Sequence, residues 1–176
     1  MNVFLTGHGF IATALKNHLE KRGHIVYQPD RARLYDKAYL GTYFETHLTD
    51  IIIHTAAYGN MTSQSAPYDT VLANIVALHN LLEASKNTPY VAFINFSSSS
   101  VLLPIQTLYS TTKSMGETLA SYYAQEKPIV NVRPYSVTGI GEQKEHLIPT
   151  LIDAACTGHE VPFVRGAKHD FIDILS

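Results

Sequence analysis

The sequence is poor in several residue types, and each shortage narrows what the protein can be. Among 176 residues there is one cysteine, Cys156, and no tryptophan, and only 16% of the residues are charged. A single cysteine excludes an internal disulfide framework and a cysteine-rich zinc site, and it predicts a reducing, cytoplasmic setting. The formal net charge is −2 without a basic stripe. We therefore expect no nucleic-acid partner.

Long apolar runs are also missing. No stretch approaches the roughly 18 apolar residues that a membrane-spanning helix needs, so we expect no membrane contact. The apolar start of the chain lacks the basic region of a signal peptide. Nine histidines are present, but His146, His159 and His169 have no ligand-like spacing, and no metal is expected.

What the sequence does contain is a regular alternation of apolar runs with helical patterns. Such alternation predicts βαβ units and an α/β fold with a Rossmann-type doubly wound parallel sheet. The expected strands are 2–6, 24–28, 50–55, 90–96, 129–133 and 161–164. The expected helices are 10–21, 34–47, 67–86, 106–125 and 148–157. Length and pattern together predict one domain over 1–176.

The first expected strand runs into Thr6-Gly7-His8-Gly9-Phe10-Ile11-Ala12, which has the spacing G-x-G-x-x-A. In a strand–turn–helix setting Gly7 permits the tight turn, Gly9 admits a pyrophosphate, and Ala12 lets the helix approach the strand. The helix N-terminus would then face the phosphates. His8 would either touch phosphate or fill the turn. Two alternatives stay open: a purely structural turn, and the glycine loop of a methyltransferase.

An acidic residue follows the second expected strand at the distance that ribose recognition requires. Asp30 lies 21 residues past Gly9, where a carboxylate would hold an adenosine ribose. Arg31 and Arg33 come directly after it and could instead hold a 2′-phosphate. NAD and NADP therefore both remain open as cofactors, with Asp30 favouring NAD.

Tyr109 and Lys113 stand four residues apart near the start of an expected helix, so they share one face. The same spacing recurs at Tyr123 and Lys127, but that pair lies at the far end of the helix and is expected to face solvent. Tyr109 follows the expected strand that ends in Ser97–Ser100. The carboxyl ends of parallel strands are where ligands bind, and this position favours Tyr109.

The chemistry of such a trio is acid–base catalysis beside a hydride carrier. A phenol with a pKa near 10 is a poor base at neutral pH, but a nearby ammonium and a charged nicotinamide would lower that pKa. Tyr109 could then exchange a proton with a substrate hydroxyl, and a serine could orient the same oxygen.

With these motifs in order, the chain resembles the extended short-chain dehydrogenase/reductase family, in its NAD-dependent epimerase/dehydratase branch. The match is closest at Tyr109-Ser110-Thr111-Thr112-Lys113-Ser114-Met115-Gly116-Glu117. It extends to Ile53–Ala57, Asn74–Ala77, Arg133–Gly139 and His169–Asp173.

The resemblance implies specific roles. Ser98, Tyr109 and Lys113 fall on the catalytic residues of the family, with Ser99 a close second to Ser98. The implied cofactor-binding residues are Gly7, Gly9, Phe10, Ile11, Asp30, Arg31, Ala56, Ala57, Asn74, Tyr109, Lys113 and Pro134. The implied activity is that of an epimerase, dehydratase or reductase acting on a nucleotide sugar. Helices 67–86 and 106–126 are implied to form a homodimer.

Four departures from the family matter. The cofactor loop is one residue shorter than the commonest family version. Only ten residues separate Ser98 from Tyr109, where the family usually has a longer loop, and His169 stands where an arginine is expected. The usual C-terminal substrate lobe is expected to be largely absent, with 140–176 as the start of a truncated substrate-binding part. This leaves an alternative function, a dinucleotide-binding sensor or partner subunit that catalyses nothing.

Overall fold

The computed structural model describes residues 1–161 and 170–174. The chain divides into two compact units, Met1–Pro134 and Tyr135–Ser176. The first unit holds a five-stranded sheet and the second a two-stranded sheet.

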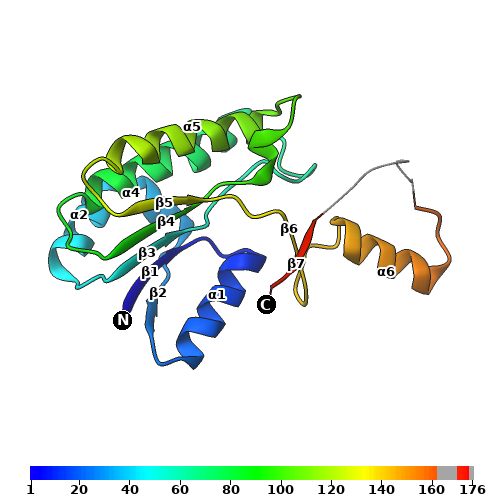
Figure 1. Cartoon of the computed structure of the whole chain (residues 1–176), viewed down its shortest axis with the longest axis horizontal. Coiled ribbons are helices and arrows are strands. Elements are labelled where there is room, and N and C mark those ends of the chain that lie inside the picture. Colours follow the sequence, from blue (N-terminus) through cyan, green and yellow to red (C-terminus); the bar gives the residue numbers. More distant parts are fainter. Residues whose placement is uncertain (162–169, 175–176) are drawn as a thin grey trace. The chain divides into compact units, whose positions relative to one another are not determined.

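The sheet of the first unit is parallel throughout and has the order β2-β1-β3-β4-β5 (Figure 1). Its strands are β1 (Asn2–Thr6), β2 (Ile25–Tyr27), β3 (Ile51–His54), β4 (Ala92–Phe96) and β5 (Ile129–Val132). The order confirms the doubly wound sheet that the alternation predicted. Because β2 and β3 lie on opposite sides of β1, the topological switch point falls between the carboxyl ends of β1 and β3.

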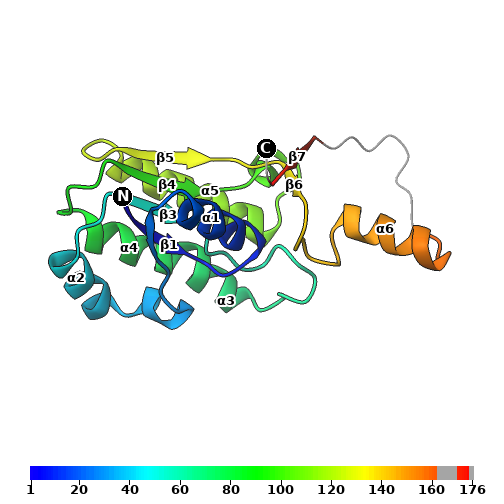
Figure 2. The same ribbon diagram turned by 90° about the horizontal axis from the view of Figure 1, so that it is seen from below.

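Helices cover both faces of this sheet. Helix α1 (Phe10–Lys21) lies on one face, and α2, α4 and α5 lie on the other; Figure 2 views the sheet from the α1 side. The helices of the second layer are α2 (Lys37–Thr46), α3 (Pro67–Val71), α4 (Ala77–Ser85) and α5 (Leu108–Tyr123), with 3₁₀ turns at Arg31–Tyr35 and Ser99–Leu102.

The larger core lies between the sheet and this second layer. Its buried side chains from the strands and helices are Phe4, Leu40, Phe44, Ile52, Leu78, Leu81, Leu82, Tyr90 and Phe93. The α1 face has a smaller core around Val3, Leu5 and Ile53. Apolar residues on consecutive positions of β1 thus serve both faces, as expected of a strand buried on two sides.

The long helix expected over 67–86 is interrupted by a wider turn. A π-helical segment, Leu72–Val76, connects α3 to α4 without a break in the helical backbone. Its Ala73 and Asn74 are both buried. Single π turns occur mostly where a helix must satisfy a local requirement, often near functional sites.

The helix expected over 34–47 begins later than predicted. Arg31–Tyr35 forms a 3₁₀ turn, and α2 begins at Lys37 because the Asp36 carboxylate accepts a hydrogen bond from the backbone N–H of Tyr39 at 2.9 Å. A side-chain acceptor at the N-cap is a strong start signal.

The second unit pairs two short strands in parallel, β6 (Ser136–Thr138) and β7 (Phe171–Asp173). Helix α6 (Leu147–Thr157) ends at Gly158, whose φ of 75° suits a left-handed cap. Both strands were missed at the level of sequence. The strand expected over 161–164 falls outside the described residues except for residue 161, and His169 also lies outside them.

Candidate functional site

The glycine loop lies at the switch point of the sheet, and Gly7 is required there by a close approach of two backbones. Its φ is 91°, and a Cβ at this position would lie 2.7 Å from Thr55 Oγ1 and 3.0 Å from the Ala56 nitrogen. Thr55 in turn donates its hydroxyl to the Thr6 carbonyl at 2.6 Å. Only glycine fits this junction of β1 and β3 without displacing backbone.

Gly9 has the opposite surroundings, since a Cβ there would meet nothing within 4 Å. It is the N-cap of α1, which has no side-chain cap and no acidic residue in its first turn. The first backbone N–H groups of a helix, here those of Phe10, Ile11 and Ala12, have no intrahelical acceptor. Open space beside Gly9 and uncapped donors with the positive end of the helix dipole fit a pyrophosphate.

The residue between the two glycines has a structural partner. The His8 ring lies 3.0 Å (Nε2) from the Pro29 carbonyl oxygen, which ties the loop after β1 to the end of β2. This contact fits the turn-filling role considered for His8.

In the segment after β2, Asp30, Arg31 and Arg33 have different surroundings. Asp30 is exposed at the start of the 3₁₀ turn. The Arg31 guanidinium lies 5.1 Å from the centre of the Tyr58 ring, in the loop that follows Ala56 and Ala57 after β3. Arg33 is turned to Asp36 in an ion pair of 3.7 Å. Arg31, rather than Arg33, therefore lies beside the β3 loop.

Asn74 lies in the π-helical turn and holds that same loop. Its amide oxygen accepts from the Tyr58 N–H, and its amide nitrogen donates to the Tyr58 carbonyl, both at 2.9 Å. The second amide hydrogen goes to Thr112 Oγ1 on α5, also at 2.9 Å. Both donors of Asn74 are thus engaged within the protein. Asn74 fixes the β3 loop against α5.

Tyr109 and Lys113 project from the first turns of α5, close to the carboxyl end of β4. The helix starts there because Thr107 and Ser110 form a reciprocal capping box. The Lys113 ammonium donates a hydrogen bond to the carbonyl of Phe96, the last residue of β4. Lys113 is buried, with 7% of its surface exposed.

The serine run begins where β4 ends. Ser98 caps the 3₁₀ turn that follows, and its hydroxyl oxygen accepts from the Ser100 N–H at 3.1 Å and from the Ser100 hydroxyl at 2.9 Å. The Ser99 N–H donates to the Pro134 carbonyl at 3.1 Å, which brings the predicted Pro134 beside the run.

Burial is the largest cause of the pKa shifts of Tyr109 and Lys113. It raises the pKa of Tyr109 above its usual value, and the Ser98 hydroxyl opposes this effect. The lowering by the Lys113 ammonium that the sequence led us to expect is not among the causes of the shift. Burial also lowers the pKa of Lys113 to about 8, and the Glu117 carboxylate opposes that shift. Lys113 is still mostly an ammonium at neutral pH.

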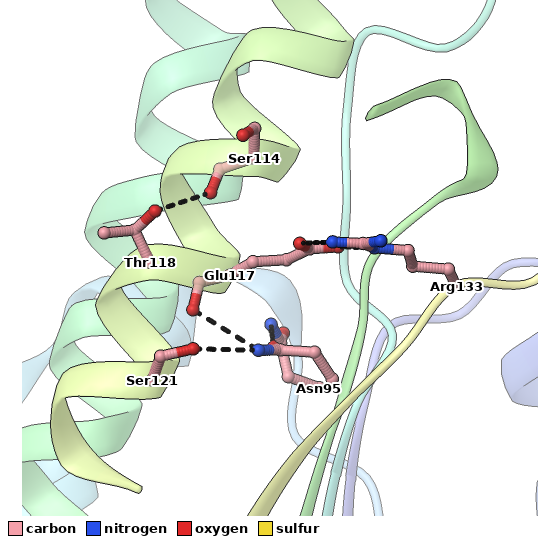
Figure 3. A network of polar contacts seen from close by, with 7 residues as sticks. Asn95, Ser114, Glu117, Thr118, Ser121 and Arg133 are labelled. Atoms are coloured by element: carbon pink, nitrogen blue, oxygen red, sulfur yellow. Dashed lines mark hydrogen bonds and ion pairs between the residues drawn. The ribbon is translucent and has the colours of Figure 1, made fainter. Parts of the chain in front are cut away.

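Glu117 and Arg133, which our sequence analysis gave no role, form a two-pronged ion pair beside the trio (Figure 3). The guanidinium donates from Nε at 2.7 Å and from Nη2 at 2.6 Å to the two carboxylate oxygens. Glu117 follows Lys113 by one helical turn, which is the sequence signal that could have identified it.

The second Tyr-x-x-x-Lys pair, Tyr123 and Lys127, makes structural contacts. The Tyr123 hydroxyl donates to the Glu83 carboxylate on α4. Lys127 donates to the Thr88 carbonyl at 3.2 Å and lies over the Tyr90 ring. Both side chains are half-buried, so the expectation that they face solvent was wrong.

The second unit has a polar cluster of its own. His146 Nδ1 lies 3.1 Å from a carboxylate oxygen of Glu142, and the Thr138 hydroxyl donates to the other oxygen at 2.8 Å. Within residues 1–161 and 170–174 no three His, Cys, Asp or Glu residues gather as metal ligands would. No helix in the described part of the chain is long and apolar enough to cross a membrane.

The parallel sheet with a glycine loop at its switch point defines a Rossmann-type α/β protein. The model of the NAD dependent epimerase/dehydratase family matches residues 3–175. The chain belongs to this family, as the resemblance of its motifs predicted. No match was found among curated protein sequences.

Solved structures agree with this placement. UDP-glucuronic acid 4-epimerase from Bacillus cereus, in complex with UDP-glucuronic acid and NAD, is 26% identical, with a TM-score of 0.79 over 99% of this chain and 69% of that one. UDP-glucose 4-epimerase from Thermotoga maritima, with UDP-glucose, shares the fold at 19% identity and a TM-score of 0.82, over 99% and 70%. UDP-N-acetylglucosamine 4-epimerase from Methanobrevibacter ruminantium shares it at 21% and 0.79, over 98% and 69%.

Proposed function

We propose that the chain is an NAD-dependent enzyme that modifies a nucleotide sugar, with Tyr109 as its acid–base residue. The observation that carries the proposal is the convergence of Ser98, Tyr109 and Lys113 at the carboxyl end of β4, in a sheet whose switch point has an open glycine loop. The similar Bacillus cereus epimerase, crystallised with UDP-glucuronic acid and NAD, supports the substrate class.

The residues that would hold the cofactor divide between its two ends. Gly7 and Gly9 shape the pyrophosphate site, and the N–H groups of Phe10 and Ile11 donate to it. Ala56 and Ala57 follow β3 at the switch point. Asp30 and Arg31 would read the adenosine ribose, with Asp30 favouring NAD. Lys113 would hold the nicotinamide ribose, beside Pro134 and the Asn74-braced loop.

Each member of the trio has a defined task. Bound NAD would supply a hydride acceptor with a positively charged ring. Tyr109 takes up or gives the proton of a sugar hydroxyl at its phenolic oxygen. Burial raises the pKa of Tyr109, and the Ser98 hydroxyl favours the phenolate form because it opposes that rise. Lys113 contributes its ammonium charge from a buried position, where water screens it little.

The test uses a control that the chain itself contains. Tyr109→Phe removes the phenolic proton donor, and we expect it to reduce turnover of UDP-sugars by about 10²–10⁴-fold. NAD affinity, measured by calorimetry, should change far less than turnover, because the other implied cofactor-binding residues remain. Tyr123→Phe changes the other tyrosine of the same spacing and should leave turnover intact. Turnover by Tyr109→Phe at the unchanged rate would refute the mechanism. Tight NAD binding with no turnover of any nucleotide sugar would favour the non-catalytic alternative.

We also propose a homodimer through helices 67–86 and 106–126. Exposed apolar side chains on these helices support it, namely Tyr68, Val71, Val76, Met115 and Tyr122. Light scattering should give twice the chain mass of 19.5 kDa, and a monomeric mass at micromolar concentration would contradict the proposal.

A further inference from the structure

The Glu117–Arg133 pair lies where the catalytic helix meets the sheet. Glu117 belongs to α5, and Arg133 follows β5, so the ion pair joins two elements (Figure 3). The Glu117 side chain is only 12% exposed, whereas that of Arg133 is 45% exposed. The carboxylate is therefore the more deeply placed partner, and water screens the guanidinium charge more than the carboxylate charge.

A second set of contacts already attaches α5 to the sheet at this point. Asn131 of β5 donates to the Glu117 backbone carbonyl at 3.3 Å and to the Ser121 hydroxyl at 3.4 Å, and it accepts from Asn95 of β4 at 2.8 Å. These bonds use the backbone of Glu117, not its carboxylate. Attachment of the helix thus does not depend on the charge of Glu117 alone.

The Glu117 charge acts on Lys113. The two residues are four apart on one helix, so their side chains share a face one turn apart. The groups that act on the Lys113 ammonium come from three elements. They are Glu117 on α5, the Phe96 carbonyl at the end of β4, and His54 at the end of β3.

Of these groups only Glu117 carries a negative charge at neutral pH. The His54 ring is fully buried, lies 2.8 Å (Nδ1) from the Thr6 hydroxyl, and stays neutral because burial lowers its pKa to about 3. The Tyr109 phenol is neutral in the resting site, because its pKa is raised. A buried ammonium without a counter-charge would tend to lose its proton.

We propose that Arg133 and Glu117 are positioning residues that hold one negative charge beside Lys113 and so keep Lys113 in its charged form. The proposal rests on the function proposed for the trio. Arg133 orients the carboxylate through its two parallel hydrogen bonds, a geometry that fixes direction as well as distance. Glu117 supplies the negative charge that keeps Lys113 protonated, Lys113 presents its positive charge at the site, and Tyr109 exchanges the proton with the substrate.

The direct test titrates Lys113 in the full chain without cofactor. Lysine labelled with ¹³C at the ε-carbon reports the protonation of each ammonium by NMR, and Lys113→Arg assigns the signal. Glu117→Gln keeps the shape of the side chain and removes its charge. We expect the pKa of Lys113 to fall by about one unit in this variant. Glu83→Gln removes a carboxylate on α4 that is paired with Lys86, and it should leave the pKa of Lys113 unchanged.

Arg133→Lys provides a second variant in case Glu117→Gln does not fold. It keeps a cation and the Glu117 charge but removes the two parallel hydrogen bonds that orient the carboxylate, so the pKa of Lys113 should fall, though by less than in Glu117→Gln. An unchanged Lys113 titration in folded Glu117→Gln or in Arg133→Lys would overturn the proposal.

The pH profile of turnover then separates this proposal from the proposed function. In Glu117→Gln the alkaline limb of the profile should move to lower pH by about the same one unit, because Lys113 loses its proton earlier. A purely structural role would lower turnover at every pH without moving the limb, which would refute the proposal. If the NMR shift appears but no nucleotide sugar turns over at any pH, the proposed function fails while the role of Glu117 stands.

Discussion

Alanine substitutions at the two glycines of the loop should affect different properties. Gly7→Ala should lower the stability of the fold, and Gly9→Ala should lower the affinity for NAD. At Gly7 the φ of 91° costs an L-residue about 1–2 kcal/mol. The new Cβ would lie 3.0 Å from the Ala56 nitrogen, which cannot move away as a flexible side chain could. Overpacking of this kind costs about 1–3 kcal/mol. Gly7→Ala should therefore destabilise the fold by about 2–5 kcal/mol.

Gly9→Ala is the matched control. The φ of Gly9 is −79°, which any residue adopts, and its Cβ would meet open space. Alanine is a poorer N-cap than glycine, but it also has less freedom to lose on folding, so the net change should stay within about 1 kcal/mol. The added methyl group would instead occupy space proposed for the pyrophosphate. NAD affinity should fall at least about tenfold, or about 1.4 kcal/mol.

Two assays separate these outcomes. Urea unfolding followed by circular dichroism gives the free energy of unfolding, and titration calorimetry gives the dissociation constant for NAD. Gly7→Ala should lower the urea midpoint strongly, and Gly9→Ala should lower only the affinity. A Gly7→Ala protein with the wild-type midpoint would refute the reading of the β1–β3 junction. A Gly9→Ala protein that binds NAD as tightly as the wild type would refute the pyrophosphate assignment.

Two further predictions concern buried polar residues. The pKa of His54 is about 3 in the folded state against an ordinary value of 6.5, so below pH 6.5 only the unfolded chain takes up this proton. Stability should fall by about 2 kcal/mol between pH 6.5 and pH 5, and urea titrations of His54→Gln should lack this component; equal slopes in both proteins would contradict the assignment. Asn74→Ala leaves the Tyr58 N–H without its acceptor and should cost about 1–3 kcal/mol of unfolding free energy. A urea midpoint equal to that of the wild type would show that the hydrogen bonds between Asn74 and Tyr58 contribute nothing to stability.

The first third of the fold could be predicted closely because its boundaries are marked by residues with strong local preferences. β1 and α1 agree with the predicted ranges to the residue, since Gly7 ends the strand and Gly23, with a φ of 79°, follows the helix. The start of α2 was missed although Asp36 is a recognisable N-cap, because the 3₁₀ turn before it shares the spacing of a helix.

Other features depend on contacts that local patterns do not carry. β6 and β7 have three residues each and pair across more than thirty positions, so neither shows a periodicity of its own. The structural roles of Tyr123 and Lys127 depend on partners in α4 and the loop after it. For the site, the motif predicted which residues would gather around β4, but not that Arg133 would pair with Glu117 one helical turn from Lys113.

The π-helical turn gives one helix two registers. Each residue advances an α-helix by about 100°, and the wider turn over Leu72–Val76 changes that advance between α3 and α4. Downstream, Leu78, Leu81 and Leu82 face the core, while Asn74 faces the β3 loop and α5. Deleting a single residue within the turn would restore a regular helix and rotate everything before it by about 100°. The leucines of α4 would still pack in the core, but Asn74 would no longer reach the β3 loop and α5. The one extra residue in the π-helical turn therefore lets a single helix both pack against the sheet and hold the β3 loop.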